Sequence, residues 1–150
     1  MLKQSLYSKL LTSALLLMPL ACSPPPAQSS DLQFGNTLQS LGTLWAGERV
    51  TLRFDFINHR DVAAIISRIE TKCGCLSPRV FVDGKQRNLP VSLNAGESGY
   101  VEVEFDTAGF KGTKETGANI YVLGSQQPIS LDVSVFLRSW FSQQPSRIVF

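Results

Sequence analysis

Hydrophobic and polar residues alternate along several short segments of this chain. Within residues 50–56, valine, leucine and two phenylalanines alternate with threonine, arginine and aspartate, which is the period of a half-buried strand. Residues 129–137 show the longest alternation of this kind. No segment shows a sustained period of 3.6 residues, so the pattern predicts an all-β chain. The segments predicted as strands include residues 50–56, 63–71, 101–105, 120–123 and 129–137.

Turn-forming residues separate these segments. Residues 58–61, 94–99 and 109–112 are rich in glycine, asparagine and charged residues, which favour turns and loops. Asp83-Gly84 predicts a hairpin turn between residues 80–82 and 88–89. About seven short strands over residues 31–138 are typical of an immunoglobulin-like antiparallel β-sandwich.

The chain begins with a pattern typical of export. Residues 1–21 combine Lys3 and Lys9 with a short apolar stretch, which is shorter than the roughly 20 apolar residues of a spanning helix. Residues 20–23, Leu-Ala-Cys-Ser, resemble a bacterial lipobox, and Cys22 is therefore the predicted lipidation site. The alternative is an ordinary secreted protein cleaved nearby. If Cys22 is lipidated, the residue that follows it is Ser23 rather than an aspartate, and this predicts sorting of the protein to the outer membrane rather than the inner membrane.

Two further segments flank the predicted sandwich. Residues 22–30 contain three consecutive prolines followed by small polar residues, which predicts an extended tether between a lipid anchor and the domain. Residues 139–150 predict a linker and the possible start of a second similar domain, because residues 145–150 resemble residues 31–34. The alternative is that the terminal Ile148-Val149-Phe150 pairs back onto the same sandwich.

The charge balance argues against a nucleic-acid partner. The whole chain carries 14 basic and 12 acidic side chains. Removal of the signal peptide takes Lys3 and Lys9 with it and leaves 12 side chains of each sign, so the mature chain is neutral. A neutral domain provides no net electrostatic attraction for phosphate backbones.

Cys73-Gly74-Cys75 is the constellation with plausible chemistry in the mature chain. In an extended strand the two β-carbons would lie roughly 6.5–7 Å apart, whereas a disulfide needs about 3.5–4.5 Å, so the bond requires a bend at Gly74. An exported protein meets an oxidising compartment, which favours closure. Three interpretations remain open: a structural disulfide or buried thiols, a Cu(I) site made by two thiolates, and redox exchange.

Other candidate residues have simpler interpretations. Basic residues outnumber acidic ones around the cysteine pair and would favour a thiolate, unless they are solvated surface charges. His59 is predicted as a turn residue, so no complete zinc ligand set is visible. Glu102 and Glu104 alternate outward on one strand and are interpreted as a solvated sheet face. We therefore expect no enzyme activity, no metal site other than the Cu(I) alternative, and no cofactor. The basic residues in question are Arg68, Lys72, Arg79, Lys85 and Arg87.

The order of several motifs resembles that of a bacterial family, domain of unknown function 1573, which is related to the Hydin/ASPM-type immunoglobulin-like domains. The matching motifs are a strand ending in Asn58, a strand leading to Cys73-Gly74-Cys75, the turn at residues 95–99, and a strand ending in Phe105-Asp106. The resemblance covers roughly residues 34–137, with residues 79–89 as a longer insertion. It implies an exported immunoglobulin-like module, often lipid-anchored, with no established activity.

Together these patterns lead to two functional hypotheses. The first is a lipid-anchored cell-envelope module with a structural or protein-interaction role, bound to the membrane through Cys22 and to a protein partner of unknown identity. The alternative is a thiol-dependent periplasmic copper-binding or disulfide-exchange protein that uses Cys73 and Cys75.

Overall fold

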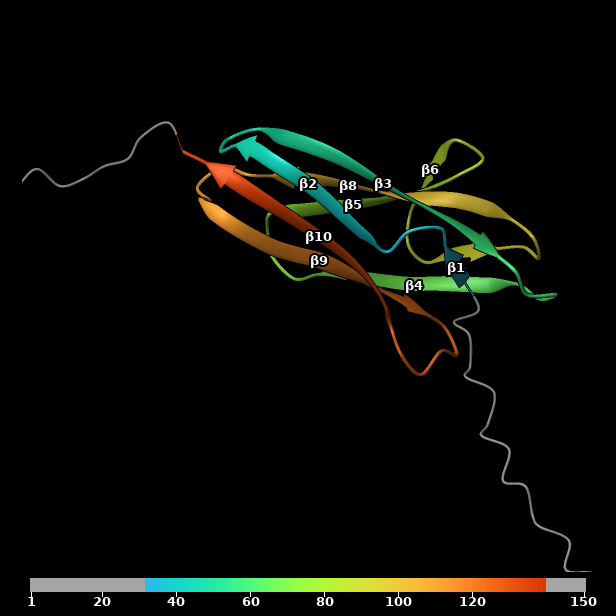
Figure 1. The fold of residues 1–150 in the computed structure, drawn as a ribbon. Coiled ribbons are helices and arrows are strands. Elements are labelled where there is room, and N and C mark those ends of the chain that lie inside the picture. The colour runs from blue at the N-terminus through green and yellow to red at the C-terminus, as the bar shows by residue number, and fades with distance from the viewer. Residues whose placement is uncertain (1–31, 140–150) are drawn as a thin grey trace, which may run out of the picture.

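The computed structural model describes residues 32–139, and within that range the chain forms ten β-strands and no helix (Figure 1). Consequently this part of the chain has no helix of the length and apolarity needed to span a bilayer. The strands are β1 Leu32–Phe34, β2 Leu38–Trp45, β3 Arg49–Asn58, β4 Ala64–Thr71, β5 Leu76–Val82, β6 Lys85–Arg87, β7 Val91–Leu93, β8 Ser98–Asp106, β9 Gly112–Val122 and β10 Ile129–Arg138.

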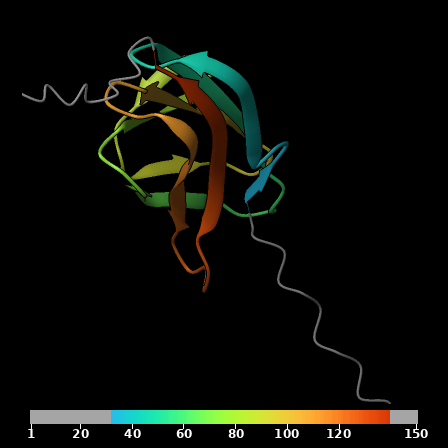
Figure 2. The ribbon, with the colours of Figure 1, turned by 60° about the vertical axis from the view of Figure 1, so that its left-hand side comes forward.

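The strands form two five-stranded sheets that pack face to face (Figure 2). One sheet has the order β1-β3-β8-β5-β6, and the other has the order β2-β10-β9-β4-β7. We call these sheet A and sheet B. Neighbouring strands are antiparallel except β2 and β10, which run parallel. The predicted all-β sandwich is confirmed, with one parallel strand pair that alternation does not reveal.

The core lies between the sheets and follows the alternation in the sequence. On β3, Leu52, Phe54 and Phe56 point inward and are buried. Strands β8 and β10 contribute in the same way, with alternate residues over 101–105 and 131–137 buried. Burial of these side chains supplies the main stabilisation, at about 25 cal/mol per Å² of apolar surface.

The structure has ten strands where the sequence predicts about seven. The additional strands are mostly short edge elements: β1, β6 and β7 have three residues each. The predicted hairpin turn is present, because Asp83 and Gly84 both have positive φ, 51° and 71°, between β5 and β6. The second strand of this hairpin is Lys85–Arg87 rather than the predicted residues 88–89. The predicted turn at residues 94–99 is also shorter than expected, because Gly99 belongs to strand β8.

The chain enters and leaves the sandwich at opposite ends (Figure 1). Leu32 at the start of β1 pairs with Asn58 at the end of β3. Arg138 at the end of β10 pairs with Trp45, close to where β3 begins. The predicted signal peptide, the lipidation site Cys22 and the tether precede residue 32, and residues 140–150 follow residue 139. Those predictions lie outside the described residues.

Candidate functional site

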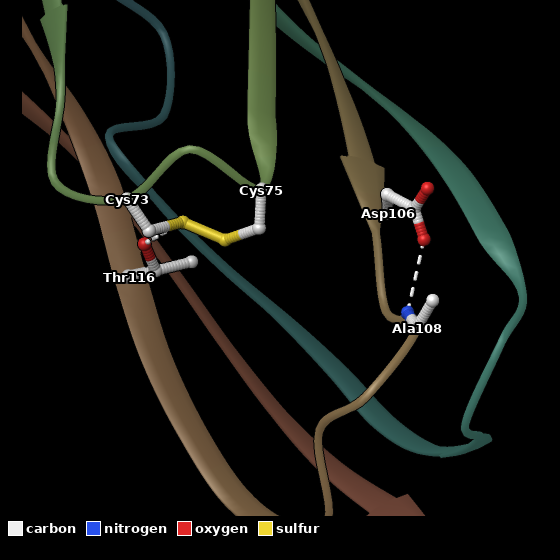
Figure 3. The surroundings of a disulfide bond; sticks show 5 residues. All are labelled: Cys73, Cys75, Asp106, Ala108 and Thr116. Carbon is white, nitrogen blue, oxygen red and sulfur yellow. Dashed lines mark hydrogen bonds between the residues drawn. A yellow bond between two sulfur atoms is a disulfide. The ribbon is translucent and has the colours of Figure 1, made fainter.

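Cys73 and Cys75 lie in the turn that connects the two sheets. The turn follows β4 of sheet B and precedes β5 of sheet A. The structure joins the two residues by a disulfide, with their Cα atoms 5.2 Å apart (Figure 3). Both side chains are half-buried and pack against the hydrophobic core. The clasp therefore stands at a corner of the sandwich, where the chain passes from one sheet to the other.

Main-chain hydrogen bonds fix both sides of this turn. The amide of Lys72 donates to the carbonyl oxygen of Gly117 on β9, at 2.8 Å. The carbonyl oxygen of Cys75 accepts from the amide of Asp106 at the end of β8, at 2.9 Å. One flank of the turn is thus attached to sheet B and the other flank to sheet A. The cysteine pair spans the short segment between the two attachments.

Thr116 provides the side-chain contact to the disulfide. Its hydroxyl donates to Cys73 Sγ at 3.2 Å from the neighbouring strand β9 (Figure 3). Thr116 is only 6% exposed, so the packing around it limits how far this hydroxyl can move away from the sulfur. No local motif marks Thr116, which is 43 residues from Cys73 in sequence. The sequence therefore gives no signal for this contact.

The sequence predicts that the disulfide requires a bend at Gly74, and the structure shows this bend without the positive φ that favours glycine. The bend exists, but Gly74 does not have positive φ, and a β-carbon at this position would meet no atom within 4 Å. The turn therefore does not depend on the conformational freedom of glycine. Gly74 is exposed, and a β-carbon there would meet no atom of any residue beyond its two chain neighbours.

Three of the five basic residues near the cysteines in sequence are neutralised by acidic partners. Lys72 Nζ pairs with Asp132 and also donates to Ser130 Oγ at 3.0 Å. The remaining two basic residues lie on the edge strand β6. This arrangement favours the interpretation of surface charges over an electropositive pocket around the thiols. The other two pairs are Arg68 with Glu70 at 2.8 Å and Arg79 with Glu102 at 2.9 Å.

The other sequence candidates do not join the cysteine pair. Glu102 and Glu104 point outward from sheet A, and Arg79 Nη2 contacts both carboxylates, at 2.9 and 3.5 Å. The predicted sheet face is therefore a paired-charge surface. His59 directly follows β3, at the end of the sandwich opposite to the cysteine pair. Among residues 32–139, no three histidine, cysteine or acidic side chains gather as a metal site would require.

A second surface of interest lies on the outer face of sheet B, along β2 and β10. Leu38 and Trp45 on β2 are 59% and 36% exposed, and Phe136 on β10 is 47% exposed. Their registers, Leu38 with Asp132 and Trp45 with Arg138, place all three on the side of the sheet opposite to the buried residues of β10. We call these three residues the apolar stripe.

Comparisons with known proteins agree with this architecture. Residues 32–137 match the family described as Protein of unknown function (DUF1573). A PapD-like domain of human CEP192 is similar in structure, with 14% identity and a TM-score of 0.52, covering 81% of this chain and 97% of that domain. A comparison with curated proteins finds no match.

Two bacterial structures share the fold over part of their length. A protein of unknown function from Porphyromonas gingivalis W83 has 15% identity and a TM-score of 0.55, covering 75% of this chain and 50% of that one. The VesB protease of Vibrio cholerae has 20% identity and a TM-score of 0.54, covering 71% of this chain and 32% of that one. This chain spans about a third of the protease and half of the P. gingivalis protein, and at these identities the likeness concerns the fold.

Proposed function

This chain belongs to the DUF1573 family of proteins of unknown function, and we propose that it works as a lipid-anchored, non-catalytic interaction module of the bacterial cell envelope, on the outer membrane rather than the inner. The lipobox-like sequence at Cys22 supports the anchor. The immunoglobulin-like fold supports the role of an interaction module, because such sandwiches present loops and sheet surfaces to partners.

The observation that carries the interaction role is the apolar stripe. Phe136 lies opposite Thr43 and therefore close to Trp45, and Leu38 lies further along the same face, opposite Asp132. Exposed apolar residues grouped on one face mark interaction sites more often than scattered ones do. The partner is a protein with a complementary apolar surface, because the mature chain is neutral and offers no charge match for nucleic acid.

Site-specific crosslinking in the native envelope tests the interaction. A photoreactive phenylalanine analogue at position 136 is expected to give one discrete adduct, and Leu38→Glu in the same chain is expected to abolish it. The matched control places the analogue at Thr51, which is exposed on the outer face of sheet A. Equal adducts from both positions, or an adduct that survives Leu38→Glu, would contradict the assignment of this surface.

The anchor is tested separately. Cys22→Ser is expected to remove palmitate labelling and to move the chain from the membrane fraction to the soluble fraction. Ser30→Ala, in the predicted tether, is the control and leaves both properties unchanged. Persistent palmitate labelling of Cys22→Ser would exclude this residue as the lipidation site.

A further inference from the structure

We propose that the Cys73–Cys75 disulfide exchanges with external thiols in a fixed direction, with attack at Cys75 and departure of Cys73. This inference goes beyond the interaction role and does not depend on it. It rests on the contact of Thr116 with one sulfur of the pair, the attachment of the turn to both sheets, and the open space beside Gly74.

The direction of exchange follows from the hydroxyl of Thr116. An incoming thiolate forms a bond to Cys75 Sγ while the bond between the two protein sulfurs breaks, and the electron pair of that bond stays on Cys73 Sγ. In the oxidised chain this sulfur lies 3.2 Å from the Thr116 hydroxyl, which is therefore placed to donate to the new thiolate. A hydrogen bond to a charged acceptor is stronger than one to a neutral sulfur, and a stabilised thiolate leaves faster. Cys75 Sγ has no such donor among the hydrogen bonds of the described residues.

The attachment of the turn makes the reaction reversible. The hydrogen bonds of Lys72 to Gly117 and of Asp106 to Cys75 involve main-chain atoms only, so exchange at the sulfurs does not require either bond to break. The Cys73 thiolate therefore stays close to the mixed disulfide on Cys75. It can attack that sulfur, reform the ring and release the external thiolate. Reactions between groups held close together proceed at a high effective concentration.

The co-reactant is a thiolate, supplied by a small molecule or by a protein dithiol. Gly74 is exposed and both cysteines are only half-buried, so an external thiolate can approach the turn from the solvent. The two sources are distinguished by using glutathione and reduced thioredoxin as separate probes on the folded, oxidised chain. Reaction with glutathione indicates access for small thiols, whereas reaction with thioredoxin alone indicates a protein thiol as the source. Either outcome supports exchange, and reaction with neither overturns it.

Trapping the intermediate tests the direction. The folded chain is mixed with excess glutathione, quenched with iodoacetamide, and digested without reductant for peptide mass spectrometry. The expected product carries glutathione on Cys75 and the alkyl group on Cys73. Glutathione found mainly on Cys73, or equally on both residues, would overturn the assigned direction.

Substitutions at Thr116 test the cause. Thr116→Val removes the hydroxyl at nearly constant volume and is expected to slow reduction by glutathione about five-fold, since one hydrogen bond to the leaving thiolate is lost. Thr116→Ser keeps the hydroxyl and is expected to restore most of the rate. Thr113→Val, at an exposed position on the same strand, is the matched control. Reduction of Thr116→Val at the wild-type rate would contradict the role of the hydroxyl, and circular dichroism checks that each variant is folded.

Discussion

The ring of Phe56 occupies the space that a side chain at Gly99 would need. The two residues are direct partners across β3 and β8. A β-carbon at residue 99 would stand 2.8 Å from Phe56 Cζ and against the main-chain oxygen of Phe81. Gly99 therefore allows the Phe56 ring to pack against the end of β8. Although the sequence of residues 95–99 is typical of a turn, Gly99 lies within a strand, where its lack of a side chain makes room for this ring.

Gly99→Ala is expected to destabilise the domain by about 2–3 kcal/mol, because the backbone of β5 and the Phe56 ring must both move to accept the methyl group. Gly74→Ala is the matched control and is expected to change stability by less than about 0.5 kcal/mol, since its methyl group meets open space. Urea unfolding followed by fluorescence measures both values. Equal destabilisation by the two substitutions would contradict this account of the strand glycine.

The sequence predicts some strands well because their two faces differ. On β3, β8 and β10 one face meets the core and the other meets water, so apolar and polar residues alternate. Strand β2 has no such signal because Gly42, with φ of +65°, lies in a bulge where the register with β10 shifts. The inward residues Leu41 and Leu44 are consequently three positions apart rather than two.

Only the part of the candidate site that lies within one short segment could be predicted from the sequence. Cys73 and Cys75 stand out because they are neighbours in sequence. Thr116 is brought to Cys73 by the pairing of β4 with β9, where Thr71 lies opposite Ala118. Such long-range registers depend on the whole sandwich. No short motif encodes them, and the same holds for the parallel pairing of β2 with β10.

Asn58 holds together the end of the sandwich opposite to the disulfide. Its buried side-chain amide donates to the carbonyl oxygens of Val62, Leu93 and Asn94, at 3.0, 3.2 and 2.9 Å. Asn58→Ala is expected to cost about 3 kcal/mol of unfolding free energy, because three buried or partly buried acceptors lose this donor, and of these the Asn94 oxygen keeps the amide of Glu97. Asn36→Ala, which removes one exposed hydrogen bond to Leu38, is the control and is expected to cost less than about 1 kcal/mol. If Asn58→Ala lowers the unfolding free energy no more than Asn36→Ala does, the loops at this end of the sandwich do not depend on the Asn58 amide for their stability.

Glu70 is expected to titrate at unusually low pH. The Tyr121 hydroxyl donates to its carboxylate at 2.8 Å, and Arg68 Nε donates to the other oxygen at 2.8 Å. These two hydrogen bonds hold the pKa of Glu70 below its ordinary value of 4.5, and the bond from Tyr121 makes the larger contribution. Because the folded-state pKa is the lower one, the carboxylate contributes stability above pH 4.5, and this contribution is lost as the pH falls through the folded-state pKa.

Tyr121→Phe is expected to raise the pKa of Glu70 toward its ordinary value and to reduce the pH dependence of stability in the acid range. Carboxyl chemical shifts in an NMR titration measure the pKa directly. Tyr100→Phe, on the outer face of sheet A, is the control and leaves the titration of Glu70 unchanged. An unchanged pKa in Tyr121→Phe would assign the shift to Arg68 alone.

Reduction of the disulfide is expected to leave the sandwich folded. Cys73 and Cys75 are separated by two positions in sequence, so the bond closes a loop of only three residues. The loop-entropy relation assigns such a loop about 1.6 kcal/mol of stabilisation, against about 3 kcal/mol for a loop of 15 residues. Most of the stability comes instead from the core between the sheets, which includes Phe54, Phe105 and Leu131 and does not depend on the bond.

Urea unfolding of the oxidised chain and of the chain kept in dithiothreitol measures this difference, and Cys73→Ala/Cys75→Ala is expected to resemble the reduced form. We expect the main-chain hydrogen bonds of the turn to Gly117 and Asp106 to persist in both cases, because they involve no cysteine side chain. Hence the reduced chain keeps a cooperative transition and loses about 1–2 kcal/mol. Loss of the transition on reduction would show that the clasp is required for folding, and a bond with that role could not be exchanged in the folded protein.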